Sequence, residues 1–362
     1  MIICRTPFRV SFFGGGTDYP AWYRKHGGAV LATTIDKYCY INLRYLPPFF
    51  DYAGRIVYSK IELFHDVSEI QHPVVREGLK MLGPLKGVAL HHDGDLPAKT
   101  GLGSSSTFTV CLLHSLHALR GRMPTKMELT HQAIHLEQNV LKESVGSQDQ
   151  TLAAHGGFNR IDFEPDDGIR ISPIILQPQR LSELQDHLML WFTGFSRFAS
   201  EIAVKQIQTM DQKERELGIM RQMVEQAQDL LNGSSDLTSF GELLHESWMI
   251  KRSLTDKIST PEIDEMYAMA RRAGAVGGKL LGAGGGGFVL LFVHPEKQNS
   301  VRKALKEFLN VPFRFERQGS QIVHYEPERP EIEPKSLGQI DGLHLEPLGK
   351  VKWRRPRKDG RE

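Results

Sequence analysis

The sequence has few cysteines and no long hydrophobic run. Its 362 residues include three cysteines, Cys4, Cys39 and Cys111, which lie far apart. The odd number and the wide spacing exclude a disulfide framework and a zinc-ligand pattern, and they are typical of a reducing compartment. The stretch MIICRTPFRV lacks the apolar core of a signal peptide, and no run approaches the roughly 18 apolar residues of a membrane-spanning helix. We therefore expect a cytoplasmic protein without a membrane partner.

A strong excess of charge of either sign is also absent. Lys and Arg number 45 and Asp and Glu number 43, so the net charge is +2 and gives no reason to expect a nucleic-acid partner. The exception is the end of a proline-rich tail over residues 327–362, KVKWRRPRKDGRE. A solvated tail is the ordinary interpretation, and an arm for nucleic acid or a partner protein is the alternative. The sequence leaves open whether the protein forms a homodimer.

Length and the order of hydrophobic patterns predict an α+β protein with two lobes. At about 150 residues per domain, the chain is long enough for two domains. Short β-rich segments fill the first hundred residues, and helical patterns follow them. We place the boundary near residue 180, which gives an N-terminal lobe over 1–180, a C-terminal lobe over 181–326 and the tail over 327–362.

Turn residues and periodicity delimit the expected elements. Strands are expected at Ile2–Arg5, Val10–Phe13, Tyr38–Leu46, Arg55–Lys60, Gly87–His92, His187–Phe195, Phe288–Val293, Phe313–Arg317 and Ile322–Tyr325. Helices are expected at Ser104–Arg120, from Thr125 past Val140, at Ser200–Leu231 as one long helix, and at Asp236–Ser253, Pro261–Ala273 and Glu296–Leu309. Thr125 and Glu128 have the spacing of a capping box.

Three glycine-rich loops are the informative motifs. They are GGGTD at residues 14–18, PAKTGLGSSS at 97–106 and GAGGGG at 282–287. In the second loop, Gly101 and Gly103 allow the backbone to approach a ligand, and the following helix presents free N–H groups and three hydroxyls. This arrangement predicts a phosphate cradle, with simple helix capping by Ser104 as the alternative. The third loop precedes a strand, so it fails the geometry of a dinucleotide fold. A tight turn between buried elements and a contact with a ligand explain this loop equally well.

In this order, the three loops resemble the motifs of the GHMP kinase superfamily. Its members have a Pro-x-Arg/Lys strand motif, a Pro-x-x-x-Gly-Leu-Gly-Ser-Ser phosphate loop and a Gly-Ala-Gly-Gly-Gly loop, which here are Pro7–Arg9, Pro97–Ser106 and Lys279–Gly287. The resemblance covers about residues 1–326. It implies a ribosomal-protein-S5-like N-terminal lobe, a ferredoxin-like α/β C-terminal lobe, and ATP and Mg²⁺ as cofactors.

Several stretches resemble, more narrowly, the heptose-phosphate kinases of this superfamily. They are RTPFRVSFFGGGTDYP, HHDGDLP, GLGSSS, VGSQDQ and GGFNRI. The resemblance implies transfer of the γ-phosphoryl group of ATP to the anomeric C1 hydroxyl of D-glycero-D-manno-heptose 7-phosphate, which gives the 1,7-bisphosphate for nucleotide-activated heptose. The alternatives are a kinase of an unphosphorylated sugar such as fucose, galactose or mannose, an ATP-dependent decarboxylase, and a non-catalytic sugar sensor.

The resemblance also implies roles for individual residues. Ser105 and Glu137 would bind Mg²⁺, Asp149 would be the catalytic carboxylate, and Arg9 would lie beside it and the transferred phosphoryl group. Many members have Ser-Gly-x-Asp before the carboxylate, whereas this chain has Gly-Ser-Gln-Asp. The nucleotide would be held by Pro97, Lys99, Gly101, Leu102, Gly103, Ser104, Ser105 and Ser106.

Substrate residues are expected in the first and third loops. The sugar pocket would be lined by Gly15, Gly16, Thr17, Asp18, Gly284 and Gly285. A phosphorylated sugar also needs a cation, for which Arg197 is the first candidate and a surface arginine is the alternative interpretation of the same residue. The further arginines considered for the second phosphate are Arg5, Arg9 and Arg44.

Overall fold

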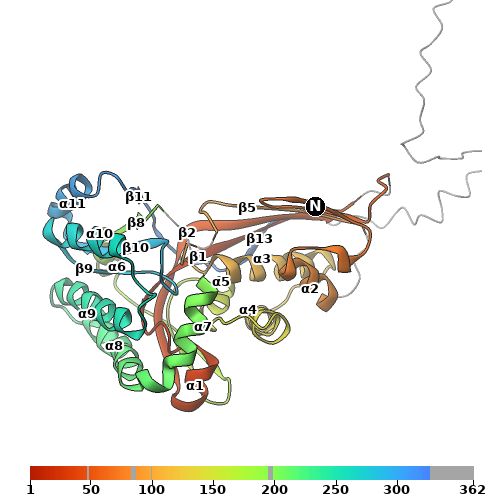
Figure 1. Cartoon of the computed structure of the whole chain (residues 1–362). Coiled ribbons are helices and arrows are strands. Elements are labelled where there is room, and N and C mark those ends of the chain that lie inside the picture. The colour runs from red at the N-terminus through yellow and green to blue at the C-terminus, as the bar shows by residue number, and fades with distance from the viewer. Residues whose placement is uncertain (47–48, 83–86, 99, 195–198, 327–362) are drawn as a thin grey trace, which may run out of the picture.

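A computed structural model describes residues 1–46, 49–82, 87–98, 100–194 and 199–326. Within them the chain forms two β-sheets with helices, an α+β architecture (Figure 1). The larger sheet has the strand order β13-β1-β2-β5-β3-β4, with β12 and β6 also paired to β2, and β7 paired to β6. Its strands are β1 (Ile2–Phe13), β2 (Gly28–Tyr45), β3 (Gly54–Val57), β4 (Ile61–Phe64), β5 (Val88–Gly94), β6 (Phe158–Phe163), β7 (Ile169–Pro173), β12 (Phe315–Glu316) and β13 (Gln321–Tyr325).

The smaller sheet is antiparallel and has the order β11-β8-β10-β9. Its strands are β8 (Leu188–Phe192), β9 (Ala275–Leu280), β10 (Phe288–Val293) and β11 (Leu309–Val311). All six side chains of the central strand β10, FVLLFV, are buried, as expected for a strand covered on both faces.

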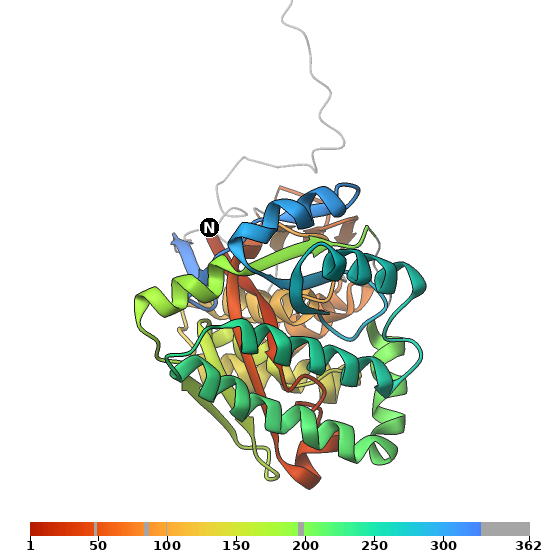
Figure 2. The same cartoon turned by 90° about the vertical axis from the view of Figure 1, so that its left-hand side faces the viewer.

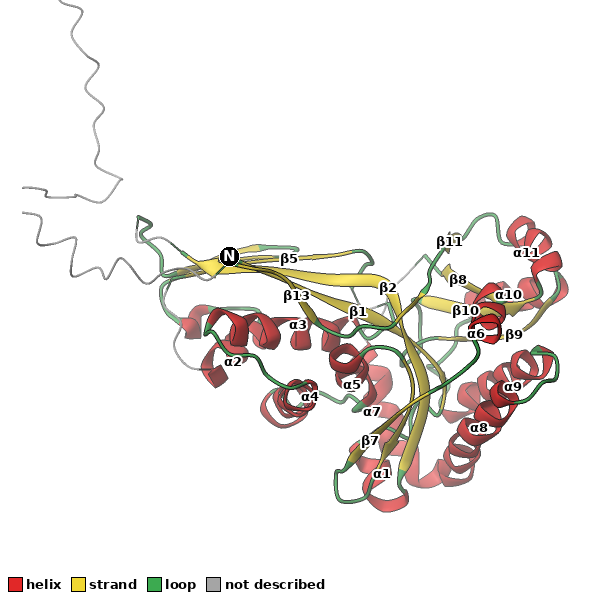
Figure 3. Ribbon diagram, turned by 180° about the vertical axis from the view of Figure 1, so that it is seen from behind, coloured by secondary structure: helices red, strands yellow, loops and turns green. Residues whose placement is uncertain are grey.

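Helices cover one face of the larger sheet and surround the smaller one (Figures 1 and 2). Figure 3 shows α2, α3 and α4 on the same side of the strands β1, β2, β5 and β13. The helices are α1 (Pro20–His26), α2 (Pro73–Leu82), α3 (Ser104–Leu119), α4 (Lys126–Ile134), α5 (Gln148–His155), α6 (Pro178–Asp186), α7 (Ala199–Thr209), α8 (Glu214–Asn232), α9 (Thr238–Leu254), α10 (Pro261–Arg272) and α11 (Gln298–Ala304). No helix of the described residues is long and apolar enough to cross a membrane.

One continuous core joins the two sheets. Phe12 and Phe13, at the end of β1, pack edge-on against Phe240 of α9, with ring centroids 5.7 and 5.2 Å apart. Phe240 in turn lies 6.3 Å from Phe292 of β10. Because aromatic side chains bury large areas, this contact fixes the end of β1 against α9. The first glycine loop follows directly, so its position is set by both lobes.

The last two strands return to the larger sheet. In β13, Tyr325 pairs with Ile2 of β1, and in β12, Phe315 pairs with Ile35 of β2. The segment 181–326 is therefore not confined to the smaller sheet, because its final strands complete the larger one. The boundary near residue 180 stays a prediction, and the tail 327–362 lies outside the described residues.

Several expected elements differ in the structure. The predicted strand Tyr38–Leu46 is the second part of the longer strand β2, and the predicted helix Glu296–Leu309 is shorter, because Leu309 begins β11. The predicted strands Ile2–Arg5 and Val10–Phe13 are a single strand β1, whose pairing with β2 shifts register between Pro7 and Arg9. The predicted helix Ser200–Leu231 is interrupted by a 3₁₀ turn at Met210–Lys213. The Thr209 hydroxyl donates to the carbonyls of Lys205 and Gln206, a back-bond that bends helices.

Candidate active site

A cavity of 570 Å³ lies where the first two glycine loops meet the third. Its walls come from β1, the start of α3, the segment before α5, and α7, α9 and β9. It is lined by Arg9, Ser11, Gly15, Gly16, Asp18, Tyr19, Gly101, Gly103, Ser104, Ser105, Ser106, Lys142, Glu143, Ser144, Val145, Gly146, Gln148, Asp149, Ala203, Val204, Gln206, Lys251, Lys279, Gly282 and Ala283. The structure thus brings together predicted residues from all three groups: the phosphate loop, the first loop and the catalytic pair.

The second loop has the backbone of a phosphate cradle. Gly101 and Gly103 have φ angles of 81° and 77°, which favour glycine, and Gly103 is the residue before α3. A Cβ on Gly101 would lie 2.5 Å from the carbonyl oxygen of Leu281, so a side chain there would separate the second and third loops. The first turn of α3 lines the cavity with Ser104, Ser105 and Ser106. A helix N-terminus in this position favours an anion, which fits the phosphates of ATP.

Arg9 connects this cradle to the predicted catalytic carboxylate. Its Nε donates to Oδ1 of Asp149 at 2.7 Å, and its Nη2 donates to Oδ2 at 2.9 Å. Its Nη1 donates to the carbonyl of Gly101 at 2.6 Å. The side chain of Arg9 is 5% exposed and that of Asp149 is 24% exposed, so the carboxylate keeps access to the cavity. This two-point pair orients Asp149 more strictly than a single charge would.

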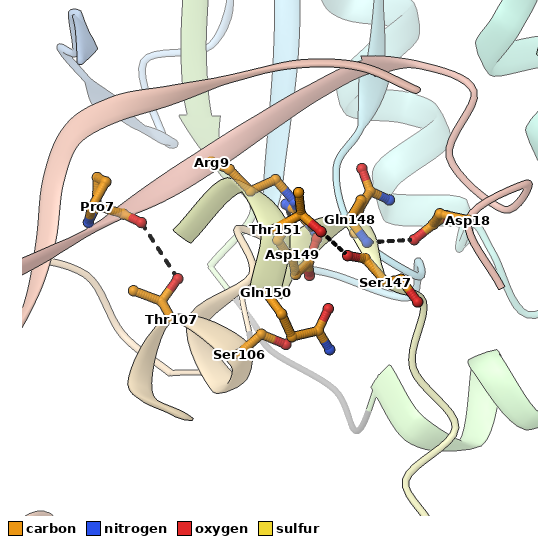
Figure 4. Close-up of polar contacts among 12 residues, drawn as sticks. Pro7, Arg9, Asp18, Ser106, Thr107, Ser147, Gln148, Asp149, Gln150 and Thr151 are labelled. Carbon is orange, nitrogen blue, oxygen red and sulfur yellow. Dashed lines mark hydrogen bonds and ion pairs between the residues drawn. The ribbon is translucent and has the colours of Figure 1, made fainter. Parts of the chain in front are cut away.

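Asp149 lies in the first turn of α5. A Cβ on Gly103 would lie 3.2 Å from Oδ2 of Asp149, so the carboxylate lies directly against the phosphate loop. Figure 4 shows Asp149 beside Arg9, and a dashed line joins the backbone nitrogen of Gln148 to the Asp18 carboxylate.

Asp18 is a second carboxylate in the same cavity. It is 2% exposed and accepts hydrogen bonds from the backbone N–H groups of Gly16, at 2.9 Å, and Gln148, at 3.4 Å. Burial raises its pKa, and the negative charge of Asp149 raises it further. A buried carboxyl group of this kind suits hydrogen bonding to the hydroxyls of a sugar.

Glu137 is placed differently from the other predicted site residues. It is fully buried and lies in a π-helical segment, His135–Val140, a distortion that often marks functional sites. Its carboxylate accepts hydrogen bonds from the hydroxyls of Ser106, at 2.8 Å, and Thr109, at 2.6 Å, and from the side-chain amide of Gln150. Burial raises its pKa to about 7.

These contacts allow a test of how well the residues suit Mg²⁺. Mg²⁺ prefers oxygen ligands and keeps several waters, so one or two protein ligands beside the phosphates suffice. Ser105 is exposed, lines the cavity and fits this requirement. Glu137 does not line the cavity and would have to exchange present hydrogen bonds for the ion. In the described chain, no three His, Cys, Asp or Glu residues cluster as a ready-made metal site.

Some predicted residues lie away from the cavity wall. Thr17 is buried, and its hydroxyl donates to the carbonyls of Gly14 and Ala29, so it shapes the first loop. In the third loop the cavity is lined by Gly282 and Ala283, whereas the N–H of Gly285 donates to Ile258. The other predicted residues that do not line the cavity are Pro97, Leu102 and Gly284. Lys99 and Arg197 lie outside the described residues.

Two of the arginines considered for a second phosphate are in the wrong place for it. Arg5 donates to Gln321 and lies over the Tyr38 ring, 4.4 Å from its centroid. Arg44 lines a separate hollow on the larger sheet together with Arg55 and His91. Neither of them lines the main cavity.

Two lysines that the site prediction did not include do line the cavity. Lys251 of α9 and Lys279 of β9 are 6% and 2% exposed. The sequence contains only a weak signal for them, since Lys279 begins the third motif and Lys251 is one basic residue in a mixed helix. Their position depends on tertiary contacts between the lobes.

Comparison with known proteins agrees with this architecture. Residues 69–157 match the GHMP kinases N terminal domain, and residues 223–311 match the GHMP kinases C terminal domain. A Campylobacter jejuni subsp. jejuni serotype O:2 protein named D-glycero-alpha-D-manno-heptose 7-phosphate kinase is 29% identical over 326 residues, which cover 84% of this chain and 92% of that protein.

Solved structures share the fold. A protein from Bacteroides thetaiotaomicron, described as a D-glycero-D-manno-heptose 1-phosphate kinase, has a TM-score of 0.70 at 24% identity and covers 88% of this chain and 98% of its own. A putative sugar kinase from Campylobacter jejuni has a TM-score of 0.66 at 26% identity over 88% and 97% of the two chains. The expected α+β GHMP kinase fold is confirmed, and the chain belongs to the GHMP kinase family.

Proposed function

We propose that the protein transfers the γ-phosphoryl group of ATP to the anomeric C1 hydroxyl of D-glycero-D-manno-heptose 7-phosphate. The product would be the 1,7-bisphosphate, a precursor of nucleotide-activated heptose. The name of the Campylobacter jejuni relative supports this substrate. The Bacteroides thetaiotaomicron structure carries the name of a heptose 1-phosphate kinase, so the position of the new phosphate is part of what must be tested.

The observation that carries the proposal is the position of Asp149 against the phosphate loop. Its carboxylate lies beside Gly103, at the N-terminus of α3, and is held at both oxygens by Arg9. A sugar hydroxyl that contacts Asp149 would therefore lie next to a phosphate in the cradle. Placing the acceptor and donor side by side supplies much of the catalysis in phosphoryl transfer.

The residues of the cavity then have separate tasks. Asp149 orients the C1 hydroxyl and accepts its proton late in the transfer, and Arg9 keeps the carboxylate in place and offsets developing negative charge. Asp18, Gly15 and Gly16 contact the sugar. Ser105 and Glu137 are the proposed contacts of Mg²⁺, Glu137 after a rearrangement of its hydrogen bonds. When bound with ATP, the ion neutralises phosphate charge.

The test is an ADP-release assay with heptose 7-phosphate, free heptose and mannose as acceptors, followed by phosphorus NMR of the product. We expect a preference for heptose 7-phosphate of roughly 10²-fold or more in kcat/KM, because a site built for a second phosphate leaves buried cations unpaired without it. Equal use of free and phosphorylated sugars would contradict the proposal. A phosphate on any carbon other than C1 would contradict its regiochemistry.

A further inference from the structure

Two buried ammonium groups line the active-site cavity without a carboxylate partner. Lys251 and Lys279 are almost completely buried, and neither forms an ion pair with any carboxylate of the described residues. Burial of a cation without an anion is costly, so such groups are rare unless they serve a ligand or a strong structural need. The cost is visible in both residues, because burial lowers the pKa of Lys251 to about 7 and that of Lys279 well below its usual value.

Backbone carbonyls satisfy only part of the hydrogen-bonding capacity of these lysines. Lys251 donates to the carbonyls of Leu280, at 3.0 Å, and Gly282, and Lys279 donates to the carbonyl of Phe12 at 2.7 Å. An ammonium group has three donors. Counting the described residues alone, one N–H of Lys251 and two of Lys279 therefore remain for a ligand.

The two lysines lie on the wall of the cavity that α9, β9 and the third loop form. Lys279 contacts Phe12, at the base of the first glycine loop, and Lys251 contacts Gly282 of the third loop. The charge of Asp18, which we assign to the sugar, acts on Lys251. The nucleotide phosphates have their own site at the start of α3, whereas these ammonium groups come from α9 and β9.

We propose that Lys251 and Lys279 bind the phosphate group that the sugar substrate already carries. Two ammonium groups match the charge of a phosphate dianion, and the ligand would supply the missing counter-charge. The inference rests on the proposed function, because it requires a phosphorylated substrate. It makes the two lysines specificity-determining residues.

The experiment compares Lys251→Gln and Lys279→Gln with Lys303→Met, a control at an exposed lysine of α11. Gln keeps an N–H for the backbone carbonyls and removes the positive charge. We expect KM for heptose 7-phosphate to rise at least tenfold in each active-site variant, the scale of a lost hydrogen bond to a charged group, while KM for ATP changes less than threefold. The ratio of kcat/KM for heptose 7-phosphate to that for free heptose should fall by at least tenfold.

A second measurement uses the wild-type protein and does not depend on the variants folding. Lysines with lowered pKa values react readily with cyanate, and mass spectrometry locates the carbamylated residues. Heptose 7-phosphate should protect Lys251 and Lys279 from carbamylation, whereas free heptose and ATP should not. Equal protection by free heptose, or protection by ATP alone, would overturn the inference.

The outcomes separate this inference from the proposed function. If wild-type protein prefers heptose 7-phosphate but both variants lose turnover equally with free and phosphorylated sugar and bind ATP weakly, the lysines serve the transferred phosphoryl group and the inference is wrong. If wild-type protein prefers a different sugar phosphate, the heptose assignment is wrong, and the lysine assignment is wrong as well if both variants keep that preference. If it prefers free sugars, both are wrong.

Discussion

Arg9 and Asp149 lie 140 positions apart in the sequence and meet in a two-point ion pair. Asp149→Asn keeps the shape of the side chain and removes its ability to accept a proton and to pair with a guanidinium group. We expect kcat to fall roughly 10²-fold or more, the usual scale of acid–base assistance, while KM for ATP stays within a few-fold. Steady-state kinetics with the preferred sugar measures both constants.

A matched control exists on the surface. Asp167 also pairs at both oxygens with an arginine, Arg24, at 2.8 and 3.1 Å, but it is exposed and does not line the cavity. Asp167→Asn should therefore change kcat less than twofold. A loss below about fivefold in Asp149→Asn would reduce Asp149 to a structural residue of α5.

The proposed ion contacts predict a dependence on Mg²⁺. Ser105→Ala should raise the Mg²⁺ concentration needed for half-maximal rate several-fold, and Glu137→Gln should reduce turnover, with both proteins folded. Addition of EDTA should abolish activity in the wild-type protein. Ser300→Ala, at an exposed position of α11, is the control. Unchanged Mg²⁺ dependence in both site variants would leave Glu137 as a buried acceptor for Ser106, Thr109 and Gln150 alone.

Motif residues at the site could be predicted, and their partners could not. The two glycines Gly101 and Gly103 are a signal in the local sequence, because glycine adopts a positive φ easily and lets the backbone approach a ligand. Lys251 has no such local signal, because its task depends on carbonyls of β9 and the third loop. The sequence predicted Glu137 as a contact of the ion. It could not predict that the carboxylate is buried, because the side chains that bind it come from α3 and α5.

At the scale of elements, the second and third loops are in direct contact. A Cβ on Gly282, where φ is +72°, would collide with the Cα of Gly101. Gly282→Ala should therefore displace the phosphate loop and raise KM for ATP by about tenfold or more. Gly218→Ala is the control, since a Cβ there meets nothing within 4 Å in the middle of α8, and alanine should stabilise the helix by up to about 1 kcal/mol. Equal ATP affinity in both variants would show that the loop contact is unimportant for binding.

The end of α5 predicts a pH dependence of stability. Burial lowers the pKa of His155 from 6.5 to about 4, and the positive charges of Lys126 and His131 act in the same direction. Between pH 4 and pH 6.5 the unfolded chain binds more protons at His155 than the folded protein does. The free energy of unfolding is therefore highest above pH 6.5, as far as His155 determines it, and decreases as the pH falls toward 4. Tm measured over this range should fall less in His155→Gln than in wild-type protein. His65→Gln, at an exposed position, should follow the wild type.

Elements with local end signals were predicted well. Helix α10 begins at Pro261 after the capping residue Thr260, and α4 has the predicted capping box between Thr125 and Glu128. The start of β2 was missed because its first eight residues, GAVLATTI, are all buried and show no alternation. The break between α7 and α8 was missed because the hydrophobic pattern continues through it.

At the scale of the whole molecule, the reactivity of the three cysteines measures whether the larger sheet and α3 are packed together. Cys4 of β1, Cys39 of β2 and Cys111 of α3 are free and at most 1% exposed. Burial raises the pKa values of Cys4 and Cys111. We expect no rapid reaction of native protein with a thiol reagent at pH 8, and three reactive thiols after denaturation. A thiol that reacts within seconds in native protein would contradict this packing.

The two-lobed organisation was predicted from the sequence, but the path of the chain between the lobes was not. Neither β12 nor β13 carries a signal for its partner, because pairing with β2 and β1 joins segments about 280 and 320 residues apart. Other long-range contacts, of Phe240 and Lys279 with Phe12, place α9 and β9 against the end of β1. The cavity is therefore a property of the assembled molecule.

This chain path has a consequence for synthesis on the ribosome. Strand β1 is among the first segments to emerge, yet its neighbour β13 lies at residues 321–325. An N-terminal domain usually folds while the rest of the chain is still being made. Here one edge of β1 stays open in the nascent chain until almost all of the described residues have been translated, and open edges are sites of aberrant pairing. The nascent chain therefore needs protection from aberrant strand pairing for most of its elongation time. Strand β13 can pair with β1 only when translation of the described residues is nearly complete.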